Sequence, residues 1–414
     1  MYRFPKGFIW ATATAAHQVE GGNTNSDVWV MEQTAHSMFK EKSGDACDHF
    51  NRYPADIRML AELGFNTYRF SIEWARVEPL PGVYSQAALA HYRRVLQCCQ
   101  DNGLEPTVTL HHFTSPIWLL QEGGWCSAKT PARFADYAAL VTDALGDLIS
   151  RICTINEANI GRVLTSSGVM PPLEKLQASK GWQEASATIG VPADTFLPFM
   201  FAVTDQAKDT VMQAHHQAVR AIRSSNPNIP CGLTLAVQDI VAVEGGSALA
   251  QLHHEQVNEA YLKQIKQDDF VGVQNYSRHR YNRDGPIAAE AGVELTQMGY
   301  EFWPESLESS IRTAHALSGL PVLVTENGIA TADDQRRQVF VHRALQGVAR
   351  CIDDEIPVLG YTYWSAFDNF EWMLGYEPTF GLIAVDRLTQ QRTIKNSAHW
   401  LGEIARSGWL PPAL

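Results

Sequence analysis

Short apolar runs recur along the chain and alternate with segments whose apolar residues are spaced as in helices. Eight runs predict β-strands, at 8–15, 67–74, 105–112, 149–157, 229–237, 269–277, 320–327 and 357–365. Several are almost continuously apolar, as in Pro321-Val-Leu-Val-Thr325, which is typical of strands buried on both faces. The pattern therefore predicts a parallel sheet covered by helices.

The segments between these runs carry helix signals. After Pro54, apolar residues recur on one helical face until Gly64, which predicts a helix that begins at Pro54. Ser85 is suited to cap a helix that runs to Gly103. Eight strands alternating with helices, without a Gly/Ser-rich linker, predict an α/β protein with a single (β/α)8 barrel domain over 1–414. A doubly wound sheet is the alternative, but no Gly-x-Gly-x-x-Gly turn follows the first run.

The longest gap between predicted strands covers 158–228 and is rich in apolar residues. It follows the fourth strand, so this insertion (about 158–205) is expected over the C-terminal face, where barrels place their sites. A lid or a pocket wall is expected there. A peripheral decoration of the fold is the alternative.

The composition narrows the class of protein. Apolar residues make up 45% of the 414 residues and charged residues 19%, which excludes disorder, and no apolar run approaches the ~18 residues of a membrane span. A net charge of −12 disfavours nucleic acid and anionic membrane surfaces as partners. The odd number of cysteines, seven, and the lack of an apolar signal segment predict reduced thiols and a cytoplasmic location.

Acidic residues end two of the predicted strands. Glu157 ends the fourth run and Glu326 lies near the end of the seventh. Active groups of a barrel lie at the carboxyl ends of its strands, so these two carboxylates are expected to face each other across its mouth. Two carboxylates flanking a bond are what glycoside hydrolysis requires. For either residue alone, a surface position is the alternative.

Polar and aromatic residues gather at the same strand ends. They are His17, Gln18, Glu20, His111, His112, Gln274, Asn275, Tyr276, Trp364, Asp368, Asn369, Glu371 and Trp372. Aromatic faces beside amides and carboxylates are typical of a sugar site. The two adjacent histidines raise a metal-dependent hydrolase as an alternative, but the first strand lacks a His-x-His pattern. We therefore predict no metal and no cofactor.

Seven motifs follow one another from residue 4 to about 400. They are Phe4-Pro-x-Gly7-Phe-x-Trp10, Tyr68-Arg-Phe-Ser-Ile-Glu-Trp74-x-Arg76, Thr154-Ile-Asn-Glu157, Gly299-Tyr-x-x-Trp-Pro-Glu305, Thr325-Glu-Asn-Gly328, Trp364-Ser-x-x-Asp-Asn-Phe-Glu-Trp372 and Phe380-Gly-Leu-x-x-Val-Asp386. In kind and order they resemble glycoside hydrolase family 1, the β-glucosidase family. The resemblance implies a (β/α)8 barrel and a retaining β-glycosidase that hydrolyses terminal non-reducing β-D-glucosyl residues through a covalent glycosyl-enzyme.

The resemblance also implies a role for each matching residue. Glu157 would be the general acid/base and Glu326 the nucleophile, with their carboxyls about 5–5.5 Å apart. Arg69 and Tyr276 would keep the nucleophile ionised and oriented. The implied substrate-binding residues are Gln18, His112, Asn156, Trp364, Glu371 and Trp372.

Departures from the family pattern and branch-specific positions refine this expectation. Glu157 stands where the thioglucosidase branch has Gln, which favours an O-glycosidase, and the negative charge of Glu371 would repel a 6-phosphate. Gln274 replaces the usual Asn. Four aromatic residues of the insertion are expected to shape an acceptor site for a bulky, apolar aglycone: Trp182, Phe196, Phe199 and Phe201.

Two other functions remain open at this point. A transglycosylase would form the same covalent intermediate and transfer the sugar to an alcohol. A sugar-binding barrel without catalysis is the other alternative. The expected partner is a small β-glucoside, and the sequence does not predict an oligomeric state.

Overall fold

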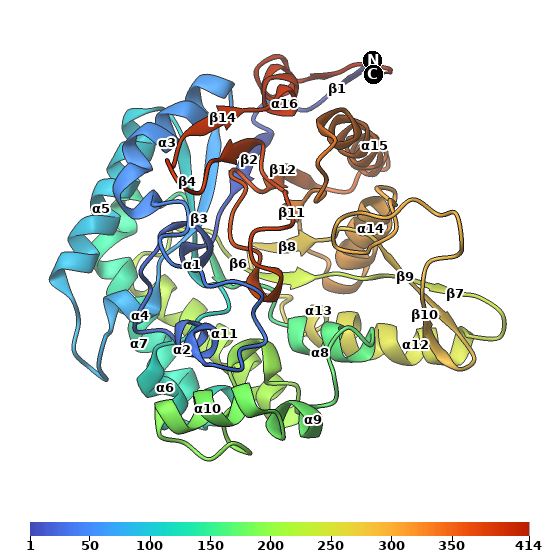
Figure 1. Cartoon of the computed structure of the whole chain (residues 1–414). Helices are drawn as coiled ribbons and strands as arrows, with labels where there is room; N and C mark the ends of the chain where they lie inside the picture. The colour runs from blue at the N-terminus through green and yellow to red at the C-terminus, as the bar shows by residue number, and fades with distance from the viewer. Residues whose placement is uncertain (414) are drawn as a thin grey trace.

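The computed structural model describes residues 1–413, and its centre is a closed barrel of eight parallel strands (Figure 1). The strands are β2 (Ile9–Ala13), β3 (Thr67–Ser71), β4 (Glu105–His111), β5 (Arg151–Ile155), β6 (Cys231–Ala236), β8 (Phe270–Gln274), β11 (Val322–Asn327) and β12 (Val358–Trp364). They follow one another around the barrel, and β12 pairs with β2 to close it. Each of the eight predicted runs contains one of these strands, so the predicted fold class is confirmed.

The barrel strands are almost entirely buried, which is why their sequences are nearly continuous apolar runs. Close strand pairing also constrains single positions. At Gly360, a Cβ atom would lie 2.3 Å from the Cβ of Ile9 on the neighbouring strand. A larger residue there would therefore separate the two strands that close the barrel.

Helices surround the barrel (Figure 1). The longer ones are α3 (His49–Leu63), α5 (Gln86–Asp101), α7 (Thr130–Leu145), α11 (Asp205–Ser225), α14 (Ser306–Ser318), α15 (Asp334–Asp353) and α16 (Asn396–Ser407). The predicted cap of α5 is confirmed, because the Ser85 hydroxyl accepts a hydrogen bond from the Ala88 amide at 3.2 Å.

The predicted start of the preceding helix is wrong by five residues, because α3 begins at His49 and includes Pro54 in its interior. The side chain of His49 contacts Asp56 at 2.8 Å and the hydroxyl of Tyr68 at 3.1 Å. These buried contacts hold the first turn in place, although Pro54 removes one helical hydrogen bond.

The insertion after β5 forms short helices: α8 (Ile160–Ser166), α9 (Leu173–Gln177), α10 (Lys180–Ile189) and the 3-10 turn η3 (Phe199–Phe201). Of these, α10 packs against α9, α2 (Asp27–Gln33) and α6 (Ile117–Gln121), whereas α8 contacts η3 and β6 (Figure 1). Trp182 packs edge-on against Phe196 and Phe201 and donates its indole N–H to the carbonyl of Ala193. These three aromatic residues are at most 1% exposed, so they form the core of the insertion.

Smaller elements complete the fold. Strands β1 (Tyr2–Arg3) and β15 (Trp409–Leu410) pair and bring the two ends of the chain together (Figure 1). A side sheet contains β7 (Asp239–Ala242), β9 (Arg278–Asn282) and β10 (Gly285–Ile287) beside α12 (Ser247–His254), and β13 (Ile383–Val385) pairs with β14 (Arg392–Ile394). Short helical turns are α1 (Ala16–Val19), α4 (Trp74–Val77), η1 (Gly124–Cys126), η2 (Gly146–Leu148), η4 (Glu255–Glu259), α13 (Ala260–Leu262) and η5 (Trp372–Leu374). Within residues 1–413, no helix has the length and apolar character needed to cross a membrane.

Candidate active site

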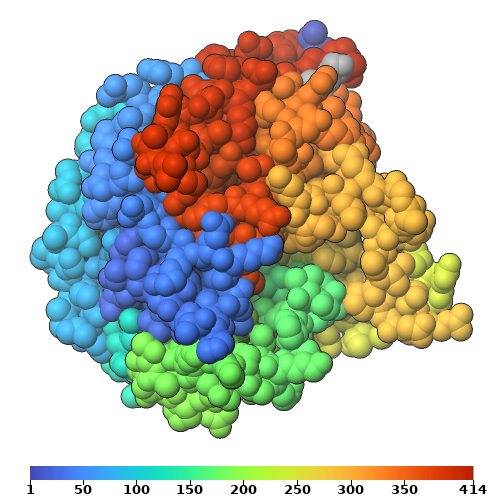
Figure 2. All heavy atoms as spheres, viewed as in Figure 1, coloured from blue at the N-terminus to red at the C-terminus, as the bar shows by residue number. Residues whose placement is uncertain are grey.

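The predicted site residues lie on the last residues of the barrel strands or directly after them. They come from seven strands: Gln18 after β2, Arg69 on β3, His112 after β4, Asn156 and Glu157 after β5, Tyr276 after β8, Glu326 on β11, Trp364 at the end of β12, and Glu371 and Trp372 in the loop after it. Figure 2 shows segments that follow several of these strands meeting on one face of the molecule. Most of the ten side chains are buried, and Tyr276 and Glu371 are half-buried.

The carboxylate of Glu326 is held from both sides. Arg69 donates from Nη1 to Oε1 at 2.6 Å, and the hydroxyl of Tyr276 donates to Oε2 at 2.6 Å. Burial raises the pKa of Glu326, while the Arg69 charge and the Tyr276 hydrogen bond oppose that rise. Both contacts favour the ionised form, which is the form that a nucleophile needs.

Glu157 has a different environment. Its backbone lies in the left-handed region, with φ +42°, and its amide donates to the Thr234 hydroxyl at 3.1 Å. Burial raises the pKa of Glu157 well above its usual range, and the charge of Glu326 raises it further. Of the two carboxyls, Glu157 therefore keeps its proton, as a general acid must.

The side chain of Asn156 is fixed by two donors. Its Oδ1 accepts from Arg69 Nη2 at 2.6 Å and from Gln274 Nε2 at 2.9 Å. Its Nδ2 is buried and has no hydrogen-bond partner among residues 1–413. Buried polar groups are nearly always paired, so this N–H group is suited to bind a substrate hydroxyl.

Gln18 lies beside Glu371, which belongs to the loop after β12. Gln18 donates to the carbonyl of Phe370 at 2.7 Å and to Glu371 Oε2 at 3.4 Å, and its buried Oε1 has no partner within 1–413. Burial and the charge of Glu326 raise the pKa of Glu371 to about 8. This carboxyl is therefore mostly protonated at neutral pH, and the expected repulsion of a 6-phosphate becomes strong only as the pH rises through about 8.

An aromatic wall borders these polar groups. The imidazole of His112 is nearly parallel to the rings of Trp364, at 5.6 Å, and Trp372, at 6.3 Å. Burial and the charge of Arg69 lower the pKa of His112 well below its usual range, so the ring is neutral. A neutral imidazole beside indole planes can hydrogen-bond a sugar whose apolar face contacts the wall.

The insertion supports this wall from behind. Phe199 stacks on Phe113 with ring centroids 6.1 Å apart, and Phe113 contacts Trp372 at 5.2 Å. Phe199 is 3% exposed, and the other three predicted aglycone residues lie deeper in the core of the insertion. Trp182, Phe196 and Phe201 are therefore buried and do not form an exposed wall, and their contribution to an aglycone site stays a prediction.

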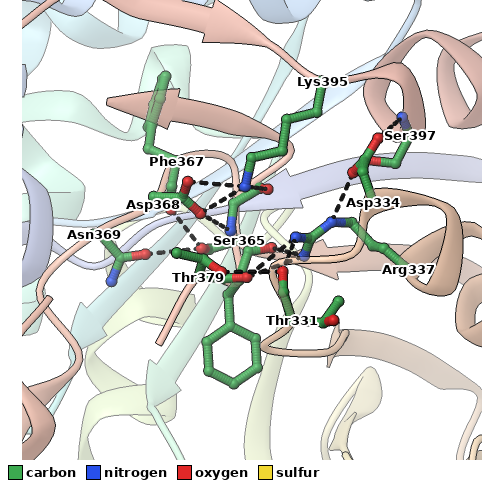
Figure 3. A network of polar contacts seen from close by, with 12 residues as sticks. Thr331, Asp334, Arg337, Ser365, Phe367, Asp368, Asn369, Thr379, Lys395 and Ser397 are labelled. Atoms are coloured by element: carbon green, nitrogen blue, oxygen red, sulfur yellow. Dashed lines mark hydrogen bonds and ion pairs between the residues drawn. The ribbon is translucent and has the colours of Figure 1, made fainter. Parts of the chain in front are cut away.

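A network of polar contacts anchors the loop that carries Glu371 and Trp372 (Figure 3). Arg337 on α15 donates to the carbonyls of Ile329 and Thr331, which follow β11, and to those of Thr379 and Phe380, which follow the loop. Lys395 pairs with Asp368 at 2.8 Å on the same loop. The loops after the seventh and eighth strands of the barrel are thus tied together.

We predict that Arg337→Met destabilises the protein strongly. Arg337 is 1% exposed, and its removal leaves several buried carbonyl groups without a donor. The expected loss is about 3–5 kcal/mol in the free energy of unfolding, measured by urea denaturation. Arg93, which pairs with Asp147 at the surface, is the control, because Arg93→Ala should cost less than about 1 kcal/mol. Similar losses for the two variants would contradict the anchoring role.

Two residues of the site were not predicted to act in it. Gln274 was noted only as a departure from the family pattern, although it contacts Asn156. Burial raises the pKa of Tyr300, and this side chain lies near enough to the Glu371 and Glu157 carboxyls for their ionised forms to raise it further. Its place in the Gly299-Tyr motif was the available signal, but the motif does not show which way the side chain points.

The adjacent histidine that raised a metal site has a packing role in the structure. His111 Nε2 contacts the Ser115 hydroxyl at 3.0 Å, and its ring packs against Trp125 and Phe199 at 4.7 Å each. In the part of the chain that the structure describes, no group of three or more His, Cys, Asp or Glu residues is arranged to hold a metal ion.

A parallel eight-stranded barrel with two buried carboxyls at its strand ends, beside amides and an aromatic wall, defines the class of glycoside hydrolases. Comparison with known proteins gives the family. The model of glycosyl hydrolase family 1 matches residues 1–247 and 247–408. The chain therefore belongs to glycosyl hydrolase family 1, and it is an O-glycoside hydrolase of the β-glucosidase type, as its motifs predicted.

Individual relatives cover the chain almost completely. The crystal structure of β-glycosidase BGL167 is 49% identical, covers 99% of each chain and has a TM-score of 0.96. A 1,4-beta-D-glucan glucohydrolase of Thermotoga neapolitana is 29% identical over 450 residues, with 99% of this chain and 100% of the relative covered. A bifunctional beta-D-glucosidase/beta-D-fucosidase of Bifidobacterium breve is 30% identical over 468 residues, covering 96% and 97%.

Proposed function

We propose that the protein hydrolyses terminal β-D-glucosyl residues with retention of configuration, with Glu326 as the nucleophile and Glu157 as the acid/base. The observation that carries this proposal is the contrast between the two carboxyls. Glu326 is paired with Arg69 and Tyr276, whereas burial and the Glu326 charge keep Glu157 protonated. One ionised and one protonated carboxyl are the two partners of a double displacement.

In the first step, Glu326 attacks the anomeric carbon from the face opposite the leaving group. Glu157 transfers its proton to the glycosidic oxygen, so the aglycone leaves as a neutral alcohol. The product is an ester between Glu326 and the sugar, with inverted configuration. Asn156 is placed to bind the 2-hydroxyl, where hydrogen bonds strengthen as the oxocarbenium-like transition state forms.

The second step follows from the change in charge. Once Glu326 is esterified, its negative charge no longer raises the pKa of Glu157, so the acid becomes a base. It takes a proton from water, which attacks the anomeric carbon and releases the sugar with its original configuration. The regenerated Glu326 carboxylate again accepts from Arg69 and Tyr276.

The remaining polar groups give the site its preference for an unmodified sugar. Gln18, His112 and Glu371 would bind the outer hydroxyls, with Trp364 and Trp372 against the ring. Fucosides lack the 6-hydroxyl. We expect the site to tolerate them, because Glu371 is mostly protonated at neutral pH and does not require a partner for a negative charge.

We also propose that residues 1–414 act as one catalytic domain in the cytoplasm, because all seven cysteines are free.

A panel of nitrophenyl β-D-glycosides tests this function. We expect the highest kcat/KM for the glucoside, lower values for the galactoside and fucoside, and at least about 100-fold lower values for the 6-phosphoglucoside, whose charge must be desolvated beside Glu371. The rate is measured by the release of nitrophenol. NMR identifies the anomer of the sugar that is released first.

The products of the reaction distinguish the retaining hydrolase from the alternative functions. A first product of the α-anomer would overturn the retaining mechanism. Transfer to an added alcohol in large excess over hydrolysis would favour a transglycosylase. The whole proposal would be contradicted if the protein cleaved none of these glycosides although its unfolding transition showed that it was folded.

A further inference from the structure

The side chain of Gln274 lies between the two central polar groups of the site. It ends β8, where it pairs in register with Glu326 of β11 on one side and Ala236 of β6 on the other. It is 1% exposed. Its Nε2 donates to Asn156 Oδ1 at 2.9 Å, and the same side chain opposes the rise that burial causes in the pKa of Glu326.

The contacts with Arg69 and Gln274 together decide which end of the Asn156 amide faces the substrate. Oδ1 accepts from two donors, Arg69 and Gln274, so a rotated amide would place its NH₂ group against both of them. Such a rotation would place the N–H groups of Asn156 opposite the N–H groups of Arg69 and Gln274. Unpaired donors in a buried site are strongly unfavourable. The amide is thus held with Nδ2 on the side that has no partner within residues 1–413.

We propose that Gln274 is a positioning residue, which holds Asn156 so that its Nδ2 donates to the 2-oxygen of the sugar in the transition state. This inference rests on the proposed function, because it presupposes a glycoside in the site. Gln274 itself does not touch the reacting atoms; it acts through Asn156.

The length of the side chain explains why glutamine is suited to this task. Asn156 follows β5, and β6 lies between β5 and β8 in the barrel. The side chain of Gln274 must therefore reach past a strand. Asparagine is one methylene shorter, about 1.5 Å, so it cannot make the 2.9 Å contact from the same backbone position.

The test compares a β-glucoside with its 2-deoxy analogue in wild-type protein and in Gln274→Met. Methionine has a similar length and fills the space without donating a hydrogen bond. We expect kcat/KM of Gln274→Met to fall about 10- to 100-fold for the glucoside and by less than about 3-fold for the 2-deoxy substrate. The ratio of kcat/KM for the glucoside to kcat/KM for the 2-deoxy substrate would therefore be smaller in Gln274→Met than in the wild-type protein.

Two further variants serve as controls for misfolding and for a general effect of removing a buried glutamine. Gln274→Asn, which is too short to reach Asn156, should show the same selective loss even if Gln274→Met folds poorly. Gln238→Met removes another buried glutamine, whose Nε2 contacts the Ala236 carbonyl, and should leave the ratio between the two substrates unchanged.

The outcomes distinguish this inference from the proposed function. Equal losses for both substrates, or no loss in either Gln274 variant, would overturn the positioning role while wild-type hydrolysis stands. A wild-type enzyme that cleaves glucosides but gains nothing from the 2-hydroxyl would overturn the role of Asn156, and the inference with it. A wild-type enzyme that cleaves no glycoside would overturn the proposed function.

Discussion

Glu326→Gly will lower kcat for nitrophenyl β-D-glucoside by on the order of 10⁴-fold or more, because no other group in the site can form the covalent intermediate. Glu326 is the carboxylate that Arg69 and Tyr276 hold at 2.6 Å each. Losing it also removes the charge that raises the pKa of Glu157. Initial rates of nitrophenol release measure the effect, with the unfolding transition as the check on folding.

Adding azide to this variant makes the prediction specific. A small anion can occupy the space that the carboxylate leaves and attack the anomeric carbon from the same face. We expect azide to restore turnover and to give the α-glucosyl azide, identified by NMR. A β-azide would place the nucleophile on the other face and contradict the role of Glu326. Unchanged hydrolysis without azide would remove Glu326 from the mechanism altogether.

The matched control for this variant is another buried acid outside the site. Asp27 is buried and accepts from the amides of Val28 and Ser115 at 2.8 and 2.9 Å. Asp27→Asn keeps an acceptor oxygen there, so we expect neither a large loss of kcat nor any rescue by azide. A comparable loss and rescue would mean that azide acts outside the place of the missing carboxylate.

The barrel could be predicted from sequence because burial on both faces leaves a direct mark on each strand. A run such as Val322–Asn327 is apolar up to the residues that reach the mouth. Helix boundaries are less well marked. The start of α3 depends on contacts of His49 with Asp56 and Tyr68, and one of these partners lies on a different element. No local pattern shows such contacts.

The candidate site was predictable to the extent that strand ends place residues together. Glu157 and Glu326 could be chosen because both end strands, and the family motifs supplied their partners. What the sequence could not show is which atoms meet. The link from Gln274 to Asn156 crosses 118 positions, and the raised pKa of Glu371 depends on burial by distant segments. The burial of the aromatic residues in the insertion could not be predicted for the same reason, since aromatic residues form a local core as readily as a binding wall.

Three neighbouring carboxyls, of which Glu157 and Glu326 are buried and Glu371 is half-buried, create the asymmetry that the proposed mechanism needs. The positive charge of Arg69 acts on Glu157 and Glu326, and of these two carboxyls Arg69 forms its ion pair with Glu326. The negative charge therefore rests on Glu326, and its field raises the pKa values of Glu157 and Glu371. Replacing either of the other two carboxyls leaves this ion pair in place.

The pH dependence of Glu157 variants follows from this arrangement. In the wild type, the acid form of Glu157 is required, so kcat/KM falls as the pH rises through its raised pKa. Glu157→Ala has no such group. For a dinitrophenyl glucoside, whose leaving group needs no proton, we expect this basic limb to disappear and the first step to stay within about 10-fold of wild type. For an alkyl glucoside or cellobiose, we expect a loss of about 10²- to 10⁴-fold.

The same variant also reports the face on which Glu157 acts. The covalent intermediate still forms from an activated glucoside, since Glu326 keeps its contacts with Arg69 and Tyr276. Its hydrolysis is slow because no base activates water, so azide should accelerate turnover and give the β-glucosyl azide, opposite to the product of Glu326→Gly. Equal losses for activated and unactivated leaving groups would contradict acid catalysis by Glu157. An α-azide from this variant would reverse the two assignments, because it would place the vacated carboxyl on the nucleophile's face.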